Sequence, residues 1–226
     1  MKKPCAFSGQ SLVDHSASSY KMVASLLAGS YPLVVARRLR RHGIEIEDPA
    51  RILRVAVELH DVGKAGEHYQ GQFDDECNPL HGKQPSFKYH EIGTAIFFYY
   101  GLDLDEKLRV LLALAELNHL NALRGLPDFN FSRLPQGFSP DMLKLSRYGK
   151  QLLNGLGYSY DVRDYTADDY VRMMRGISSY VNQGYLKLYV LFLAPIIVGD
   201  NLDSASRAPE EKRRFVEILR KEVSDL

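Results

Sequence analysis

The segment 52-ILRVAVELHDVGK-64 joins an apolar helix to an adjacent histidine and aspartate, His60 and Asp61. Its apolar residues recur at helical spacing: Ile52, Val55, Ala56, Leu59 and Val62. An imidazole and a carboxylate at the end of an apolar helix need polar partners, and a divalent cation supplies them. Gly63 is expected to end the helix, which leaves Lys64 about one turn from the pair.

The helical pattern continues along most of the chain, and no stretch alternates convincingly with period two. We expect helices at about 11–28, 32–42, 49–62, 90–100, 104–124, 140–154, 167–181, 185–206 and 209–224. Asp103 with Glu106, and Thr166 with Asp169, resemble capping boxes at two helix starts. Pro195 should kink the helix that contains it.

The sequence therefore predicts an all-α fold, with a single domain over residues 1–226. Two connections, 65–89 and 125–139, are unusually long. Loops of this length inside a compact domain are usually functional, so we expect both to lie over the functional site.

Composition indicates an ordinary globular protein. The chain has 226 residues, 45% of them hydrophobic and 25% charged. Its net charge of +1 does not indicate a nucleic-acid binder, so any basic surface would have to be local.

Several features predict a cytoplasmic protein that does not associate with membranes. The two cysteines, Cys5 and Cys77, are far apart in the sequence and are expected to be reduced thiols. Residues 1–10 lack the apolar core of a secretory signal. The most apolar run, 186–199, is too short to span a bilayer and is interpreted as a buried core helix.

Four further side chains could bind a metal with His60 and Asp61, because they stand at helix ends or in apolar contexts: His15, His90, His119 and Asp200. The other histidines have polar or loop surroundings: His42, His68 and His81. A single histidine beside apolar residues is more often part of a packed core than a ligand. The order His, His-Asp-x-Gly-Lys, His, His, Asp on a helical chain favours a metal centre.

This order resembles the HD superfamily of metal-dependent phosphohydrolases. Within it, the chain is most similar to the CRISPR-associated HD nuclease of type I systems, which is either fused to a helicase or stands alone. The resemblance is to the stand-alone form and covers nearly the whole chain. It implies a single HD-domain helical bundle with long loops over a metal centre.

The resemblance implies six metal ligands: His15, His60, Asp61, His90, His119 and Asp200. They would hold one or two divalent ions (Mn²⁺, Mg²⁺, Co²⁺, Ni²⁺ or Fe²⁺), bridged by Asp61. Asp61 and Lys64 are the expected catalytic residues. Asp200 and Ser204 match the family's Asp-x-x-x-Ser pattern, and Asp203 is the alternative for the late aspartate.

One position departs from the family, which usually has two consecutive histidines where this chain has Asn118-His119. An amide oxygen is a weaker ligand than imidazole for a transition metal. The first site, from His15, His60, Asp61 and Asp200, is therefore the more complete. Asn118 and Ser204 are candidates for a second-site or substrate contact.

The resemblance implies a nuclease that cuts single-stranded DNA, or RNA as well, in CRISPR interference beside a separate helicase. Lys64 would contact a phosphate oxygen, although an ordinary helix C-terminal cation is the alternative. A region rich in basic and aromatic residues suits single-stranded nucleic acid, or else fastens a loop to the core: Arg124, Phe129, Phe131, Arg133, Phe138, Lys144, Arg147 and Tyr148.

The basic run 37–41 is either a solvated helix face or a docking surface for the helicase or nucleic acid. Two alternative functions remain open. One is an HD-type hydrolase of a nucleotide or cyclic dinucleotide, which should enclose its substrate in a closed pocket. The other is a non-catalytic helical assembly subunit with a degenerate metal site, which Asn118 favours.

Overall fold

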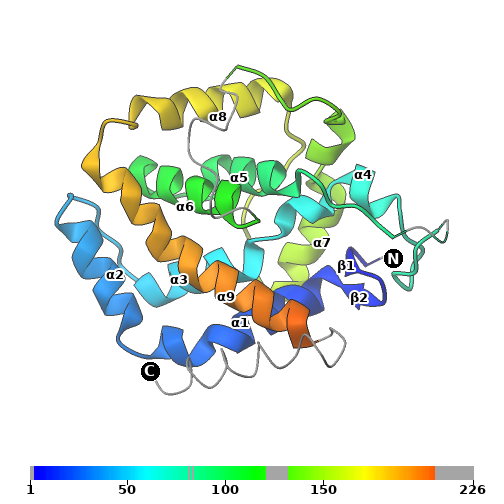
Figure 1. Cartoon of the computed structure of the whole chain (residues 1–226), viewed down its shortest axis with the longest axis horizontal. Helices are drawn as coiled ribbons and strands as arrows, with labels where there is room; N and C mark the ends of the chain where they lie inside the picture. Colours follow the sequence, from blue (N-terminus) through cyan, green and yellow to red (C-terminus); the bar gives the residue numbers. More distant parts are fainter. Residues whose placement is uncertain (1–2, 81, 83, 121–131, 207–226) are drawn as a thin grey trace.

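The fold is a bundle of helices, seen in a computed structural model that describes residues 3–80, 82, 84–120 and 132–206 (Figure 1). Its α-helices are α1 (Leu12–Ala28), α2 (Tyr31–Arg40), α3 (Pro49–Leu59), α4 (Glu67–Gln70), α5 (His90–Tyr100), α6 (Glu106–Asn118), α7 (Ser146–Leu156), α8 (Ala167–Ser179) and α9 (Val190–Ser206). The described residues also form 3₁₀-helices η1 (Val62–Ala65), η3 (Pro140–Leu143) and η4 (Gly184–Tyr189). The all-α fold predicted from the sequence is confirmed.

A small antiparallel hairpin precedes α1, and the sequence did not predict it. Strand β1 (Cys5–Phe7) pairs with β2 (Gln10–Ser11). Gly9 lies in the turn between them with a φ of +73°, a conformation that favours glycine. Strands this short cannot display a period-two pattern, which explains the omission.

Several predicted boundaries are corrected by the structure. Helix α3 ends at Leu59, and Gly63 lies within η1 instead of ending the helix. The cap of α6 is Asp105, not Asp103. The helix predicted at 140–154 is the separate pair η3 and α7. The helix predicted at 104–124 ends earlier, at Asn118, and the predicted helix at 209–224 lies outside the described residues.

Helix α9 is a core element that packs against α1, α3 and α6 and runs diagonally across the view in Figure 1. By length and composition alone, the span Gly184–Ser206 could cross a membrane. One side of α9 is buried, however, through residues that include Phe192, Pro195 and Ile196. The apolar run 186–199 thus contributes to the core of the bundle, as predicted.

Two glycines allow backbone segments to touch near the middle of the bundle. A Cβ atom on Gly63 would lie 2.0 Å from the His90 carbonyl oxygen. The Gly63 amide donates to Thr94 Oγ1 at 2.9 Å, so η1 lies directly against the start of α5. A Cβ atom on Gly199 would lie 2.7 Å from the Ser19 carbonyl oxygen, so α9 lies against α1 in backbone contact as well. These contacts draw α1, η1, α5 and α9 together.

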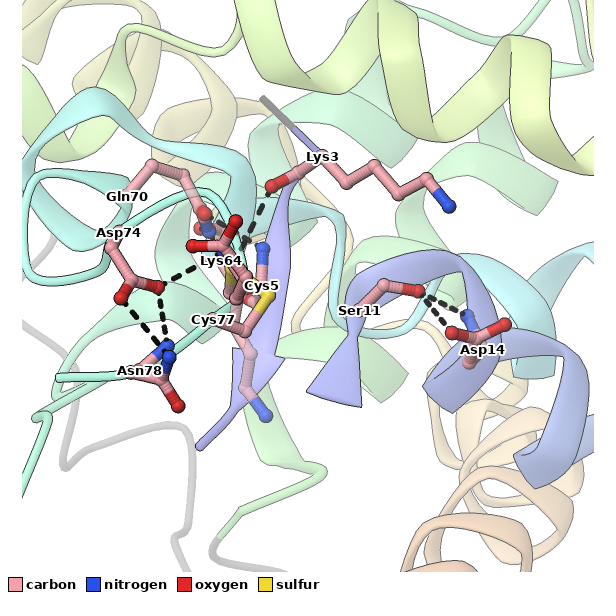
Figure 2. Close-up of a disulfide and its surroundings, with 10 residues drawn as sticks. Lys3, Cys5, Ser11, Asp14, Lys64, Gln70, Asp74, Cys77 and Asn78 are labelled. Carbon is pink, nitrogen blue, oxygen red and sulfur yellow. Dashed lines mark hydrogen bonds between the residues drawn. A yellow bond between two sulfur atoms is a disulfide. The ribbon is translucent and has the colours of Figure 1, made fainter. Parts of the chain in front are cut away.

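The structure overturns the prediction of two reduced cysteines, because Cys5 and Cys77 form a disulfide with a Cα–Cα distance of 5.5 Å (Figure 2). The hairpin carries Cys5 to the segment that follows α4, although 72 residues separate the two cysteines. Gln70 reinforces this contact by accepting from the Cys5 amide and donating to the Cys5 carbonyl. Sequence separation was therefore a poor guide to distance in space.

The disulfide should contribute strongly to stability, because it closes a long loop in the unfolded chain. In the chain-entropy model a loop of this length corresponds to about 4 kcal/mol. We expect Cys77→Ser to lower the free energy of unfolding by roughly that amount, measured by urea unfolding without reductant. The wild type in dithiothreitol should approach the variant. The disulfide would be contradicted if dithiothreitol left the unfolding free energy of the wild type unchanged and a thiol assay found two free thiols.

Helix α8 begins with the predicted capping box of Thr166 and Asp169, which is confirmed. Arg163 and Arg172 bind the same carboxylate at 3.0 and 2.7 Å. Burial opposes ionisation of Asp169, but these hydrogen bonds outweigh it and hold the pKa of Asp169 well below its ordinary value. The ionised carboxylate therefore stabilises the folded state at neutral pH.

We expect Asp169→Asn to lower the free energy of unfolding by about 1–2 kcal/mol at pH 7, because the charged N3 partner of the Thr166 cap is lost. A depressed pKa stabilises the fold above the unfolded pKa, near 3.8, and this contribution disappears as the pH falls towards the lower folded value. The difference between variant and wild type should thus shrink below about pH 4. Urea unfolding from pH 7 to pH 3 measures this, with exposed Asp168→Asn as the control. If the difference in unfolding free energy between wild type and Asp169→Asn stays constant with pH, the lowered pKa of Asp169 is refuted.

Candidate metal centre

The structure brings all six predicted metal ligands together in the middle of the bundle. They come from α1 (His15), the residues that follow α3 (His60 and Asp61), the start of α5 (His90), the end of α6 (His119) and α9 (Asp200). Their nitrogen and oxygen atoms form two groups, within each of which the atoms lie no more than 4.8 Å apart: His15, His60, Asp61 and Asp200 in the first, and Asp61, His90 and His119 in the second.

Asp61 belongs to both groups, and its two oxygens face different histidines. Oδ2 lies 2.8 Å from His15 Nε2 and 3.4 Å from His60 Nε2. Oδ1 lies 2.7 Å from His90 Nε2 and 3.6 Å from His119 Nε2. A carboxylate divided in this way can bridge two cations.

The four histidines share one orientation, with Nδ1 directed outwards and Nε2 towards Asp61. Each Nδ1 has an oxygen partner: Asp203 Oδ2 for His15 at 2.7 Å, and the carbonyls of Val57 for His60 at 2.8 Å, Phe87 for His90 at 2.7 Å and Glu116 for His119 at 2.6 Å. A carbonyl oxygen only accepts, so Nδ1 carries the proton in those three rings. This tautomer leaves the Nε2 lone pair available to a cation.

Inward-facing atoms that lack hydrogen-bond partners indicate whether a metal ion fits this centre. His15 Nε2 and His60 Nε2 are buried and make no hydrogen bond of acceptable geometry among the described residues. The Nε2 atoms of His90 and His119 lie 3.1 Å apart, so two lone pairs would face each other. A cation between these atoms relieves both problems. The donor set of imidazoles and carboxylates suits Mn²⁺, Co²⁺, Ni²⁺ or Fe²⁺ better than Ca²⁺.

The charges of the centre are strongly coupled. Burial disfavours a charged His60, but Asp61 and Asp200 outweigh burial and raise the His60 pKa well above its usual value. Burial likewise opposes ionisation of Asp61, yet His60, Lys64 and His90 hold its pKa well below the usual value. Asp61 is therefore ionised at neutral pH, and positive charge must accumulate around it.

Lys64 lies inside the centre and is 5% exposed. Its Nζ is 2.6 Å from Asp61 Oδ2 and lies over the rings of Phe7 and Phe87, at 4.2 and 5.0 Å from their centroids. The Lys64 carbonyl accepts a hydrogen bond from Gln70, which links this turn to the hairpin (Figure 2). Lys64 is thus held against the shared carboxylate and is not an ordinary surface cation.

The remaining candidates contact the centre in different ways. Ser204 donates to Asp200 Oδ1 at 3.2 Å. Asp203, the alternative late aspartate, contacts the outer nitrogen of His15 and belongs to neither group. Asn118 is buried, and its Nδ2 donates to the Leu114 carbonyl at 2.8 Å. Asn118 Oδ1 has no hydrogen-bond partner among the described residues.

Sequence reasoning missed some residues that shape the centre. Gln70, Phe7 and Phe87 surround Lys64, and no feature of their sequence context predicts this. Glu116 is completely buried, and neither carboxylate oxygen has a hydrogen-bond partner in the described structure. Burial raises the Glu116 pKa well above its usual value, so the side chain tends to keep its proton.

The region rich in basic and aromatic residues is only partly described. Arg124, Phe129 and Phe131 lie outside the described residues. Of the others, Phe138 and Tyr148 pack on the core, and Lys144 pairs with Asp141 at 2.7 Å. Arg133 and Arg147 are exposed. The described aromatics therefore fasten the segment to the core, which was the alternative interpretation.

The other predicted surfaces and histidines are separate from the centre. The arginines of run 37–41 are exposed on and just after α2. His42 and His68 belong to neither group, and His81 lies outside the described residues.

Comparison with known proteins identifies the family. The profile described as "Cas3, HD domain" matches residues 3–123. The CRISPR-associated endonuclease Cas3-HD of Saccharolobus solfataricus is 45% identical over 99% of this chain and 98% of its own. The CRISPR-associated Cas3 HD domain protein from Methanocaldococcus jannaschii has a similar fold, with a TM-score of 0.54 and 21% identity over 88% of this chain and 99% of that one. The chain therefore belongs to the Cas3 HD-domain family.

Proposed function

We propose that this chain is a metal-dependent nuclease that hydrolyses phosphodiester bonds of single-stranded DNA in CRISPR interference, beside a separate helicase. The observation that carries the proposal is the convergence of four Nε2 atoms and Asp200 on the two oxygens of Asp61. The relative that is 45% identical is an endonuclease by name, which supports the same activity.

The residues of the centre have distinct parts in this proposal. A divalent ion held there would activate water and stabilise charge on phosphate oxygens. Asp61 joins the two groups, and Ser204 fixes one oxygen of Asp200 by a hydrogen bond. Lys64 balances the charge of Asp61 and is close enough to the ligands to neutralise a phosphate oxygen as well. Asn118 Oδ1, buried and without a hydrogen-bond partner, is the candidate for a further second-site or substrate contact.

The proposed partners follow from the family and from the surface. Separate helicase and interference subunits would bind outside the centre, and the exposed arginines after Leu33 on α2 offer a basic surface for them or for nucleic acid. Leu33, itself 67% exposed, adds an apolar contact beside these arginines. We propose a cytoplasmic location from the proposed function alone, because the Cys5–Cys77 disulfide removes the argument from reduced cysteines.

Hydrolysis of a nucleotide or cyclic dinucleotide is the second candidate, because the same centre suits any phosphate ester. The third, a non-catalytic assembly subunit, rests on Asn118 in place of a histidine. Against it, all six predicted ligands meet in the centre, and both groups retain at least two histidines with Asp61.

We expect Asp61→Asn to abolish tight metal binding and to lower nuclease activity by about 100-fold or more, because both groups lose their shared charge. Bound Mn²⁺ per chain, measured after equilibrium dialysis, and the cleavage rate should fall together while the helical circular dichroism is retained. Exposed Asp168→Asn serves as the control for loss of one carboxylate. A variant with wild-type cleavage at saturating Mn²⁺ would exclude this centre as the active site.

We expect the wild type to cleave single-stranded circular DNA faster than duplex DNA, as the proposed function requires. Mn²⁺, Co²⁺ or Ni²⁺ should support more cleavage than Ca²⁺, because imidazole nitrogens dominate the centre. Labelled DNA of both kinds, RNA and a cyclic dinucleotide are compared in parallel. Preferential hydrolysis of the dinucleotide would favour the second function. If none of these substrates is hydrolysed, the assembly subunit is favoured, whether or not the protein binds a metal.

A further inference from the structure

Helices α1 and α9 run antiparallel, and their contact places Asp203 behind the ring of His15. Gly199 touches the Ser19 carbonyl, and one turn away on each helix Asp203 Oδ2 lies 2.7 Å from His15 Nδ1. Asp203 is 1% exposed and His15 is fully buried. A buried carboxylate at this distance from an imidazole nitrogen makes a charge-assisted hydrogen bond.

His15 differs from the other three histidines in the partner of its outer nitrogen. His60, His90 and His119 stand at helix ends, and each uses the carbonyl of the third residue before it. His15 lies inside α1, where the preceding carbonyls are occupied by the hydrogen bonds of the helix. Its Nδ1 therefore needs an acceptor from another element, and Asp203 of α9 provides one.

We infer that Asp203 is a positioning residue that holds the Nδ1 proton of His15 and thereby aims Nε2 at Asp61 and Asp200. The Nε2 atom lies 2.8 Å from Asp61 Oδ2 and 3.5 Å from Asp200 Oδ1. The inference rests on the proposed function in one respect, namely that this Nε2 binds a metal ion. Asp203 itself lies on the outer side of the ring and contributes no atom to either group.

Asp203 also makes the two groups electrostatically unequal. The first group contains Asp61 and Asp200, and the Asp203 carboxylate lies on the opposite side of the His15 ring from them. The second group has only the shared Asp61. Carbonyls accept from the outer nitrogens of both its histidines, and the Glu116 carboxyl 3.8 Å from His119 Nδ1 has a pKa raised by burial. A carboxylate behind a ligating histidine raises its basicity and its affinity for a cation. The first group should therefore bind its ion more tightly than the second.

The first arm of the experiment needs no metal. Metal-free protein labelled with ¹⁵N-histidine is studied by NMR correlation of the ring nitrogens and protons, with His15→Gln to assign the signals. The wild type should show a proton on Nδ1 of His15, shifted far downfield as expected beside a carboxylate. That signal should be lost in Asp203→Asn, whose amide can turn its NH₂ towards Nδ1 and favour the Nε2–H tautomer. Asp14→Asn, which removes the exposed carboxylate beside His15 in the sequence, should keep it.

The second arm measures Mn²⁺ binding by calorimetry in a His119→Gln background, so that the first group dominates. Adding Asp203→Asn should weaken this binding by about 10- to 100-fold, whereas adding Asp14→Asn should leave it nearly unchanged. Circular dichroism and the melting temperature of the metal-free proteins show whether each variant remains folded.

The outcomes separate the inference from the proposed function. An unprotonated Nδ1 of His15 in the wild type, or unchanged Mn²⁺ affinity in Asp203→Asn, would overturn the inference. So would a loss of affinity that accompanies loss of the helical signal, because Asp203 would then have only a structural role. If the downfield proton is present but wild-type protein binds no divalent ion, the hydrogen bond stands and the proposed function is wrong.

Discussion

The structure depends on an ionised carboxylate, Asp61, buried at the meeting point of five helical segments. Burial alone would drive this group to its neutral form, so the surrounding fold has to supply positive charge and hydrogen-bond donors. Lys64 places its Nζ 2.6 Å from Asp61 Oδ2, and four imidazoles complete the surroundings. The histidines are held from outside by carbonyls and by Asp203, so their inner nitrogens are aimed before any ion arrives.

Such a centre requires backbones to approach more closely than side chains normally permit, and glycine makes this possible at two contacts. Gly63 lets the turn after Asp61 lie against the first residues of α5, which carries His90. Gly199 lets α9 lie against α1, so that Asp200 and Asp203 flank the two sides of the His15 ring. The glycine after the His-Asp pair is therefore a packing requirement of the centre, in place of the helix stop that the sequence suggested.

The family, the enzyme class and the all-α fold were predictable, because helical periodicity and the order of histidines and aspartates are visible along one chain. The same order identified the six side chains that the structure brings together, while their metal-binding roles stay a prediction. The contact of Asp203 with His15 was not predictable, because it depends on the register of two helices 188 residues apart. The Cys5–Cys77 bond was missed for the same reason: long-range pairing leaves no local pattern.

The disulfide has a topological consequence for the centre. It closes residues 5–77 into a covalent ring, and that ring contains His15, His60, Asp61 and Lys64. His90, His119 and Asp200 lie on the part of the chain outside it. If a single peptide bond within the ring is cut, the two pieces remain covalently joined. A chain nicked there thus keeps the shared carboxylate, its lysine and two of the four imidazoles in one connected molecule.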